Sequence, residues 1–231
     1  ILYPVRMCRQ VAACAGGTRE ELYGMLGVYN YTVVLTYIGM LTGLTGIGFA
    51  MSGRIPWALL CLLLAGLCDM FDGKVASLKK NRTAQEKRFG VQIDSLSDLI
   101  CFGVLPAATV YATARGSILV GVIAGLYVLC ALIRLAWFNV DEEERQEGTD
   151  SQREIYLGLP VTTAALFLPT ILGVARLLHR PLPVLGTSLL IVMAVAFLTP
   201  FKLVKPRLAG KLLMILIGCG ELVIVLLGVK P

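Results

Sequence analysis

The sequence predicts an all-α polytopic membrane protein, with about six or seven transmembrane helices preceded by an interfacial amphipathic helix at the N-terminus. Of its 231 residues, 57% are hydrophobic and 16% are charged, and the mean hydropathy is +0.78. Soluble domains are about 45–50% apolar and about 25% charged. Seven apolar stretches also approach the roughly 20 residues that a helix needs to cross a bilayer. They lie at residues 30–51, 56–76, 90–112, 117–138, 157–176, 184–200 and 212–229.

The segment before the first apolar stretch is too polar to span a membrane and predicts a helix that lies on its surface. Thr18-Arg-Glu-Glu21 fits a capping box, in which a threonine and a glutamate three residues later close the start of a helix. Apolar side chains then recur at helical spacing, at Leu22, Met25, Leu26 and Tyr29. We expect an amphipathic helix that leads into the first span. A plain surface helix would give the same pattern.

Glycines and prolines within the apolar stretches fit closely packed helices. The first stretch contains Gly39-x-x-x-Gly43 and the fourth contains Gly121-x-x-x-Gly125, and small residues one turn apart let helix backbones approach. This pattern fits packing within one chain as well as packing between two chains. Pro56 and Pro160 stand near predicted helix starts, where the missing N–H of proline does no harm.

The charges orient the chain in the membrane and argue against a nucleic-acid partner. With the N-terminus in the cytoplasm, the inner segments hold 14 Lys and Arg residues and the outer segments hold 5. This is the distribution expected from the positive-inside rule. The net charge of +6 is therefore explained by an anionic membrane surface. Seven scattered cysteines without a CxxC pair predict buried thiols rather than a zinc site or a disulfide frame.

Four aspartates at the cytoplasmic ends of the second and third predicted spans are the candidate functional residues: Asp69, Asp72, Asp94 and Asp98. A carboxylate in the hydrocarbon region costs roughly 2.5–3.5 kcal/mol, so a group of four indicates a bound cation. Spacings of three and four residues place each pair on one face of a helix. Because the connection 77–88 is short, we expect antiparallel neighbouring helices with both pairs at the same end.

Four carboxylates from two facing helices are suited to two divalent cations. Oxygen-only ligation favours Mg²⁺ or Mn²⁺ over zinc, and two ions bridged in this way lie roughly 3.5–4 Å apart. The small residues Gly73, Ala76 and Gly90 lie near the carboxylates and leave room for a pyrophosphate or a nucleoside. The alternative is that the aspartates serve as helix caps and as a charged rim beside the basic loop.

The aspartates are part of a longer pattern, Asp69-x-x-Asp72-Gly73-x-x-Ala76 followed by Gly90-x-x-x-Asp94-x-x-x-Asp98. This pattern resembles the signature of the CDP-alcohol phosphotransferases, integral membrane phosphatidyltransferases of phospholipid synthesis. Within that family, the stretches 89–107, 134–139 and 156–160 are most similar to the phosphatidylserine synthases. The resemblance covers roughly residues 30–175. We therefore divide the chain into an interfacial segment, 1–29, and a transmembrane catalytic domain, 30–231.

The resemblance implies a reaction in which an alcohol, with L-serine the best match, attacks the β-phosphate of CDP-diacylglycerol and releases CMP. It implies two divalent cations, Mg²⁺ or Mn²⁺, with the metal ligands Asp69, Asp72, Asp94 and Asp98. Asp98 would also take the proton from the attacking hydroxyl. The CDP-binding residues that it implies are Asp69, Gly73, Ala76, Ser77 and Gly90. It further implies a homodimer in a bacterial or archaeal cytoplasmic membrane, with the active site at the cytoplasmic face.

Positively charged residues supply further candidates for substrate binding. Arg134, near the cytoplasmic end of the fourth span, is expected to bind the carboxylate of serine, or else to snorkel at a helix end. Five cations in one loop are expected to attract the anionic lipid substrate: Lys79, Lys80, Arg82, Lys87 and Arg88. A basic loop that simply faces the membrane is an equally good interpretation.

The chain departs from the family pattern at positions that bear on its substrates. The family usually has Ala-Arg where this chain has Ala76-Ser77, so a cationic contact is absent there, and Lys74 and Arg82 are candidates to replace it. The connection from Ser77 to Gly90 is also longer than the commonest family spacing. The serine-synthase motif normally has a second arginine at the position of Trp137.

Three alternatives to serine transfer stay open. The acceptor in the same reaction could be glycerol 3-phosphate, inositol or inositol phosphate. The acid cluster could belong to a cation transporter or channel, although the outer halves of the predicted spans are almost wholly apolar. Ser77 also fits a family member that has kept the fold and lost its activity.

Overall fold

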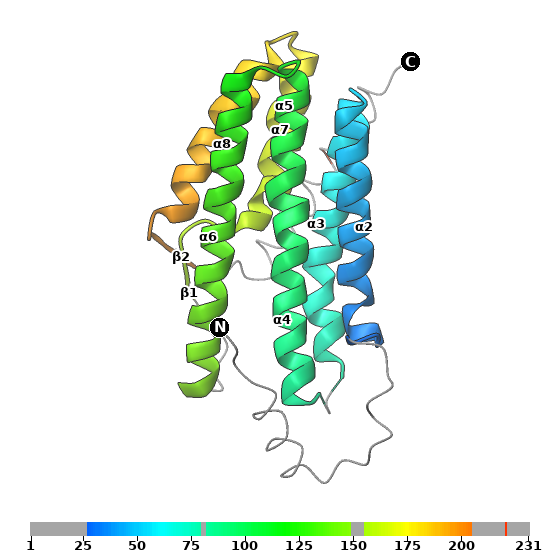
Figure 1. Ribbon diagram of the computed structural model, residues 1–231, viewed down its shortest axis with the longest axis vertical. Coiled ribbons are helices and arrows are strands. Elements are labelled where there is room, and N and C mark those ends of the chain that lie inside the picture. Colours follow the sequence, from blue (N-terminus) through cyan, green and yellow to red (C-terminus); the bar gives the residue numbers. More distant parts are fainter. Residues whose placement is uncertain (1–26, 80–81, 149–154, 205–219, 221–231) are drawn as a thin grey trace, which may run out of the picture.

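The computed structural model describes residues 27–79, 82–148, 155–204 and 220, which form a bundle of long helices (Figure 1). The α-helices are α2 (Tyr31–Met51), α3 (Ile55–Ser77), α4 (Ala84–Asp98), α5 (Leu105–Thr113), α6 (Ile118–Gly148), α7 (Ala164–Leu177) and α8 (Leu182–Leu198). A π-helical turn, η2 (Leu99–Val104), joins α4 to α5, and a 3-10 turn, η3 (Val161–Thr163), precedes α7. The predicted apolar stretch 212–229 and nearly all of the predicted interfacial helix lie outside the described residues.

Four described helices are long and apolar enough to cross a membrane: Tyr31–Met51, Ile55–Ser77, Gln85–Thr113 and Ile118–Glu144. Two shorter apolar helices are Val161–Leu177 and Leu182–Leu198. Large apolar side chains stay exposed on the outside of the bundle, for example on α6 at Ile118, Leu119, Val122 and Leu126. Lipid tails, rather than water, are the solvent that such a surface requires. The protein is therefore a helical integral membrane protein, as the sequence predicts.

Local sequence determines where the helices begin. The side chain of Asn30 caps α2 by accepting a hydrogen bond from the amide of Thr32 at 3.1 Å. Pro56 stands in the first turn of α3. A capping box starts α4, because the Thr83 hydroxyl accepts from the Glu86 amide at 3.1 Å and the Glu86 carboxylate accepts from the Thr83 amide at 3.0 Å. This box starts the third span at residue 84 instead of the predicted residue 90.

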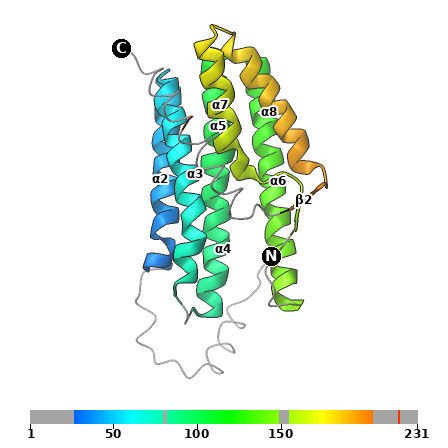
Figure 2. The ribbon, with the colours of Figure 1, turned by 180° about the vertical axis from the view of Figure 1, so that it is seen from behind.

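The helices pack closely around a core of large side chains. Helices α2 and α3 run side by side in both views of the ribbon (Figures 1 and 2). A Cβ atom on Gly43 would lie 2.6 Å from Cys101 Sγ, and one on Gly46 would lie 2.8 Å from Cys61 Cβ. Only glycine at these two positions allows the neighbouring helices to approach so closely. The largest fully buried side chains are Tyr127, Phe102, Phe197, Leu62, Leu105 and Leu168.

Two predicted boundaries are wrong. The spans predicted at 117–138 and 157–176 leave residues 139–156 as a connection between them, but α6 continues to Gly148. Glutamate and arginine are good helix formers in water, so the chain leaves the membrane without ending the helix. The predicted fifth span, 157–176, also begins too early, because Leu157 belongs to a strand and the helical segment begins only at Val161.

That strand is a small departure from the all-α prediction. Strand β1 (Ile155–Leu157) pairs in antiparallel fashion with β2 (Lys202–Val204). The amide of Gly158 also donates to the Phe201 carbonyl at 2.7 Å. Gly158 has a φ of 76°, and a Cβ atom there would lie 3.0 Å from the Thr199 carbonyl oxygen, so this turn requires glycine. The pairing ties the segment before α7 to the end of α8.

Candidate metal and nucleotide site

Helices α3 and α4 bring the four aspartates to one place between them. Asp69 and Asp72 are one turn apart on α3, and Asp94 and Asp98 are one turn apart on α4. One carboxylate oxygen from each of Asp69, Asp94 and Asp98 lies within 4.8 Å of the other two. Asp72 is 8% exposed. The antiparallel helix pair thus gathers carboxylates that are 29 positions apart in the sequence, from 69 to 98.

Helix α2 adds polar groups that the sequence reasoning did not identify. Thr36 Oγ1 donates to Asp72 Oδ2 at 3.2 Å, and the main-chain oxygen of Thr36 accepts from Ser97 Oγ at 3.4 Å. Thr32, one turn earlier, is buried as well. The sequence does contain a signal for these polar groups, because Thr32 and Thr36 stand four residues apart at the start of an otherwise apolar span.

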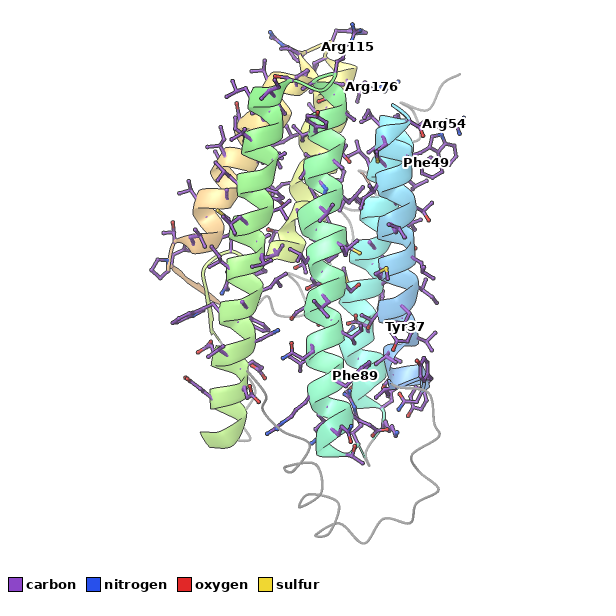
Figure 3. All side chains as sticks on the ribbon, viewed as in Figure 1. Tyr37, Phe49, Arg54, Phe89, Arg115 and Arg176 are labelled. Carbon is purple, nitrogen blue, oxygen red and sulfur yellow. The ribbon has the colours of Figure 1, made fainter. Side chains whose placement is uncertain are left out.

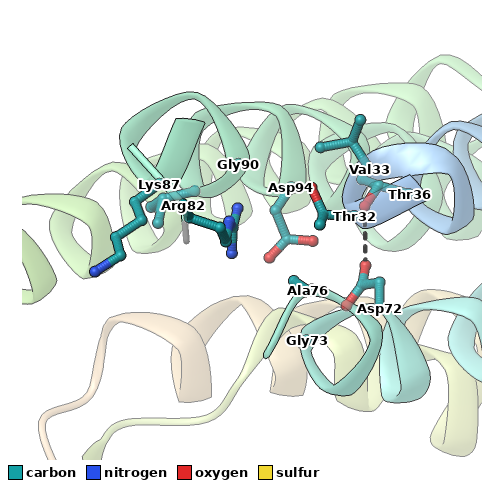
Figure 4. A pocket seen from close by; sticks show the side chains of 11 residues that line it. Thr32, Val33, Thr36, Asp72, Gly73, Ala76, Arg82, Lys87, Gly90 and Asp94 are labelled. Carbon is teal, nitrogen blue, oxygen red and sulfur yellow. Dashed lines mark hydrogen bonds between the residues drawn. The ribbon is translucent and has the colours of Figure 1, made fainter. Parts of the chain in front are cut away.

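An open pocket of about 190 Å³ lies between α2, α3 and α4, beside the carboxylates (Figure 4). Its walls combine the threonines of α2 with Asp72 and Asp94 and with the arginine and lysine at the start of α4. A smaller cavity, which shares Thr36, Asp72 and Asp94 with the pocket, contains Asp69 and Asp98. The arrangement therefore places a polar chamber directly against the carboxylate cluster.

The three small residues of the signature, Gly73, Ala76 and Gly90, all line the pocket but have different surroundings. Gly73 and Ala76 line the pocket, and a Cβ atom on Gly73 would meet nothing within 4 Å. Gly90 also lines it, but a Cβ there would lie 2.6 Å from Arg82 Nη2. Ser77 is not among the pocket-lining residues, and its hydroxyl donates to the Lys74 carbonyl at 2.7 Å.

The structure separates the five loop cations that the sequence groups together. Arg82 and Lys87 line the pocket. Arg88 does not line it, and its exposed Nε lies 3.9 Å from Glu143 Oε1 on α6. Lys80 lies outside the described residues. An anionic ligand in the pocket would therefore meet Arg82 and Lys87 before any other described residue of this group.

The fifth cation, Lys79, belongs to a set of bonds around Glu86. Glu86 Oε1 accepts from Lys79 Nζ at 2.6 Å and from Asn30 Nδ2 at 3.0 Å. Its other oxygen belongs to the capping box with Thr83. One carboxylate thus joins the end of α3, the start of α4 and the cap of α2.

Arg134 is buried on α6, as the sequence predicts, but it does not line the described pocket. Its Nε donates to the Leu159 carbonyl at 3.3 Å, beside the turn that follows β1. Trp137, one turn further along α6, is 64% exposed. The described contact supports a structural role for Arg134 in holding the segment before α7.

The pocket lies away from the arginines of the predicted outer side. Figure 3 places Arg54, Arg115 and Arg176 at one end of the bundle and Phe89, which precedes Gly90 of the pocket, toward the other. This is the separation of charge and site that the positive-inside count predicts.

The donor set at the cluster fits a divalent cation. Among the described residues, none of the four aspartates forms a salt bridge, so no cationic side chain balances them there. Buried carboxylates without a counter-charge are costly. Converging carboxylate oxygens are the ligands that Mg²⁺ and Mn²⁺ prefer. Asp69, Asp94 and Asp98 could therefore hold such an ion, with Asp72 beside them.

Comparison with known proteins places this geometry in context. Residues 29–201 match the family model of the CDP-alcohol phosphatidyltransferases. A CDP-diacylglycerol--serine O-phosphatidyltransferase of Mycobacterium leprae is 35% identical over 57% of this chain and 43% of its own length. The Saccharomyces cerevisiae protein of the same name is 34% identical over 63% and 54%, respectively. An archaetidylserine synthase of Methanothermobacter thermautotrophicus is 34% identical over 58% and 53%. The chain thus spans about half the length of these relatives.

Proposed function

Because the chain belongs to the CDP-alcohol phosphatidyltransferase family, we propose that it transfers a phosphatidyl group from CDP-diacylglycerol to L-serine, giving phosphatidylserine and CMP. The observation that carries the reaction type is the buried carboxylate cluster beside an open polar pocket. The choice of serine rests on the names of the relatives, each of which includes serine as the acceptor or as part of the product.

The carboxylates have two roles in this proposal. Asp69, Asp72 and Asp94 are the main ligands for divalent cations, Mg²⁺ or Mn²⁺, and Asp98 lies near enough to be a further ligand. When bound, these cations would neutralise the charge of the pyrophosphate and of the departing CMP. Asp98 accepts the proton of the serine hydroxyl as its oxygen bonds to the β-phosphorus of the donor. The bond from that phosphorus to the CMP oxygen breaks, so the phosphatidyl group passes to serine.

The pocket supplies the nucleotide site. The open space over Gly73 and Ala76 supports an approach of the CDP group to the backbone of α3. The hydroxyl of Thr36 holds Asp72 in one orientation through their 3.2 Å hydrogen bond. A fixed carboxylate lowers the cost of arranging the site when the substrate enters.

The membrane arrangement supports a lipid donor. The pocket opens at the end that the charge count assigns to the cytoplasm, where soluble serine and CMP are exchanged. The apolar outer faces of the same helices contact the acyl chains of the bilayer, which the donor shares. We also carry over the homodimer implied by the family, which cross-linking in native membranes would test.

The proposal is tested by CMP release from the purified protein supplied with CDP-diacylglycerol and Mn²⁺ or Mg²⁺. L-serine, glycerol 3-phosphate, inositol and inositol phosphate are compared as acceptors, with Asp98→Asn as the inactive control. We expect release that depends on serine and is lost in the variant. Release with another acceptor would overturn the choice of serine and keep the reaction type. No release with any acceptor, from protein that binds CDP, would overturn the activity.

A further inference from the structure

Arg82 is held in an unusual position at the mouth of the pocket. It lines the cavity, and its Nε is shielded from solvent and has no hydrogen-bond partner in the described structure. Its Nη2 donates to the main-chain oxygen of Glu86 at 3.2 Å. A buried donor without a partner carries a free-energy cost. A ligand that accepts from this guanidinium would remove that cost.

The surroundings keep this guanidinium in place before any ligand arrives. Its Nη2 would lie only 2.6 Å from a Cβ atom on Gly90, so the absence of a side chain there makes room for Arg82. Glu86, which receives Nη2 on its backbone, is itself fixed by Lys79, Asn30 and Thr83. The loop is therefore preorganised around an arginine.

The direction of the side chain separates Arg82 from its neighbour. Figure 4 shows the guanidinium of Arg82 on the side of Asp94, whereas the side chain of Lys87 leads away from the carboxylates. Arg82 forms no salt bridge with a described carboxylate. A ligand bridging the space between them would meet carboxylates at one end and a guanidinium at the other.

We propose that Arg82 binds the diphosphate group of the nucleotide donor and is the residue that sets affinity for it. The inference rests on the proposed function, and it assigns to Arg82 the cationic contact that Ser77 cannot make. A diphosphate fits both ends of the space, since cations held by the carboxylates would bind one set of its oxygens and the forked guanidinium would bind another. Gly90 and Glu86 then act as positioning residues for Arg82.

The test measures CDP binding to the full-length protein in detergent with Mn²⁺, by titration calorimetry. Arg82→Gln removes the charge and the fork, and we expect CDP affinity to fall about tenfold or more, as for a lost hydrogen bond to a charged group. Arg82→Lys keeps the charge without the fork and should be intermediate. Arg88→Gln removes the same charge at a nearby position on α4, outside the pocket, and should change affinity less than about twofold.

Kinetics then distinguish a binding contact from general damage. In Arg82→Gln, KM for CDP-diacylglycerol should rise about tenfold while KM for serine stays unchanged. Equal CDP affinity in wild type and Arg82→Gln, or equal losses in Arg82→Gln and Arg88→Gln, would overturn the assignment and leave the proposed function standing. A rise confined to KM for serine would overturn it in favour of the acceptor. Failure of the wild type to bind CDP would instead overturn the proposed function.

Discussion

Replacing Asp98 by asparagine should make the protein more stable without divalent cations and should weaken the stabilisation that the cations give. Carboxylate oxygens of Asp69, Asp94 and Asp98 lie within 4.8 Å of one another. Two unit charges at that distance repel by about 3.5 kcal/mol at an effective dielectric constant of about 20, which is an upper bound because an empty carboxylate cluster takes up protons. Asparagine removes two of the three repulsions and keeps nearly the same shape. The cluster is therefore strained when empty and stabilising when filled.

The expected sizes follow from these energies. For a chain of this length, 1 kcal/mol corresponds to about 2–4 °C in Tm, so Asp98→Asn in EDTA should melt at least about 5 °C above wild type. A cation at about 100 times its Kd stabilises wild type by about 2.7 kcal/mol, and the variant gains less because it has lost a charged ligand. The difference between the two melting temperatures should therefore shrink on adding Mn²⁺.

Thermal unfolding in detergent, followed with a thiol-reactive dye, gives the measurement because Cys61 and Cys101 are buried free thiols. Glu143→Gln is the matched control, since it makes the same chemical change at an exposed carboxylate on α6. It should leave both melting temperatures unchanged. Lower stability of Asp98→Asn in EDTA, or no effect of Mn²⁺ on wild type, would show that Asp98 serves as a structural hydrogen-bonding group and would refute the reasoning.

Two further predictions use the same melting assay. Gly46→Ala should lower Tm by several degrees, because its methyl group would lie 2.8 Å from Cys61 Cβ and overpacking costs about 1–3 kcal/mol. Gly48→Ala, two residues along the same helix with nothing within 4 Å, should not lower Tm, and equal losses would contradict the packing argument. Tyr127→Phe should cost about 1–3 kcal/mol, because the Phe102 carbonyl loses its 2.7 Å hydrogen bond inside the core. An unchanged Tm would mean that another group satisfies that carbonyl.

The parts of the site that were predictable from sequence share a short-range cause. Asp69 and Asp72, like Asp94 and Asp98, are separated by one helical turn, and a short connection forces their helices together. Helical periodicity and loop length therefore suffice to gather them. The capping box of Thr83 and Glu86 follows from the same local spacing as the one predicted at Thr18-Arg-Glu-Glu21.

The parts that were missed depend on contacts across the fold. Gly90 looks like a space for the nucleotide, and only the folded loop reveals that it makes room for Arg82. The pairing of β1 with β2 joins segments separated by two helices, and nothing local marks it. Hydropathy also marks the point where α6 leaves the membrane, but the helical hydrogen bonds continue beyond that point to Gly148. Apolar content thus predicts the spans better than it predicts the ends of helices.

The π-helical turn η2 lets α4 and α5, which it joins, each take its own rotation about the helix axis. Each α-helical residue advances by about 100°, and a π turn accommodates roughly one residue more than an α turn. The rotation of α4 sets the direction of Asp94 and Asp98, which precede η2. The rotation of α5 places Leu105 and Val110, which follow η2, in the apolar core. Removing one residue from 99–104 would turn the carboxylates by about 100° relative to the core. The carboxylate-bearing half and the apolar half can therefore each be fitted to its own neighbours, with η2 absorbing the difference in rotation.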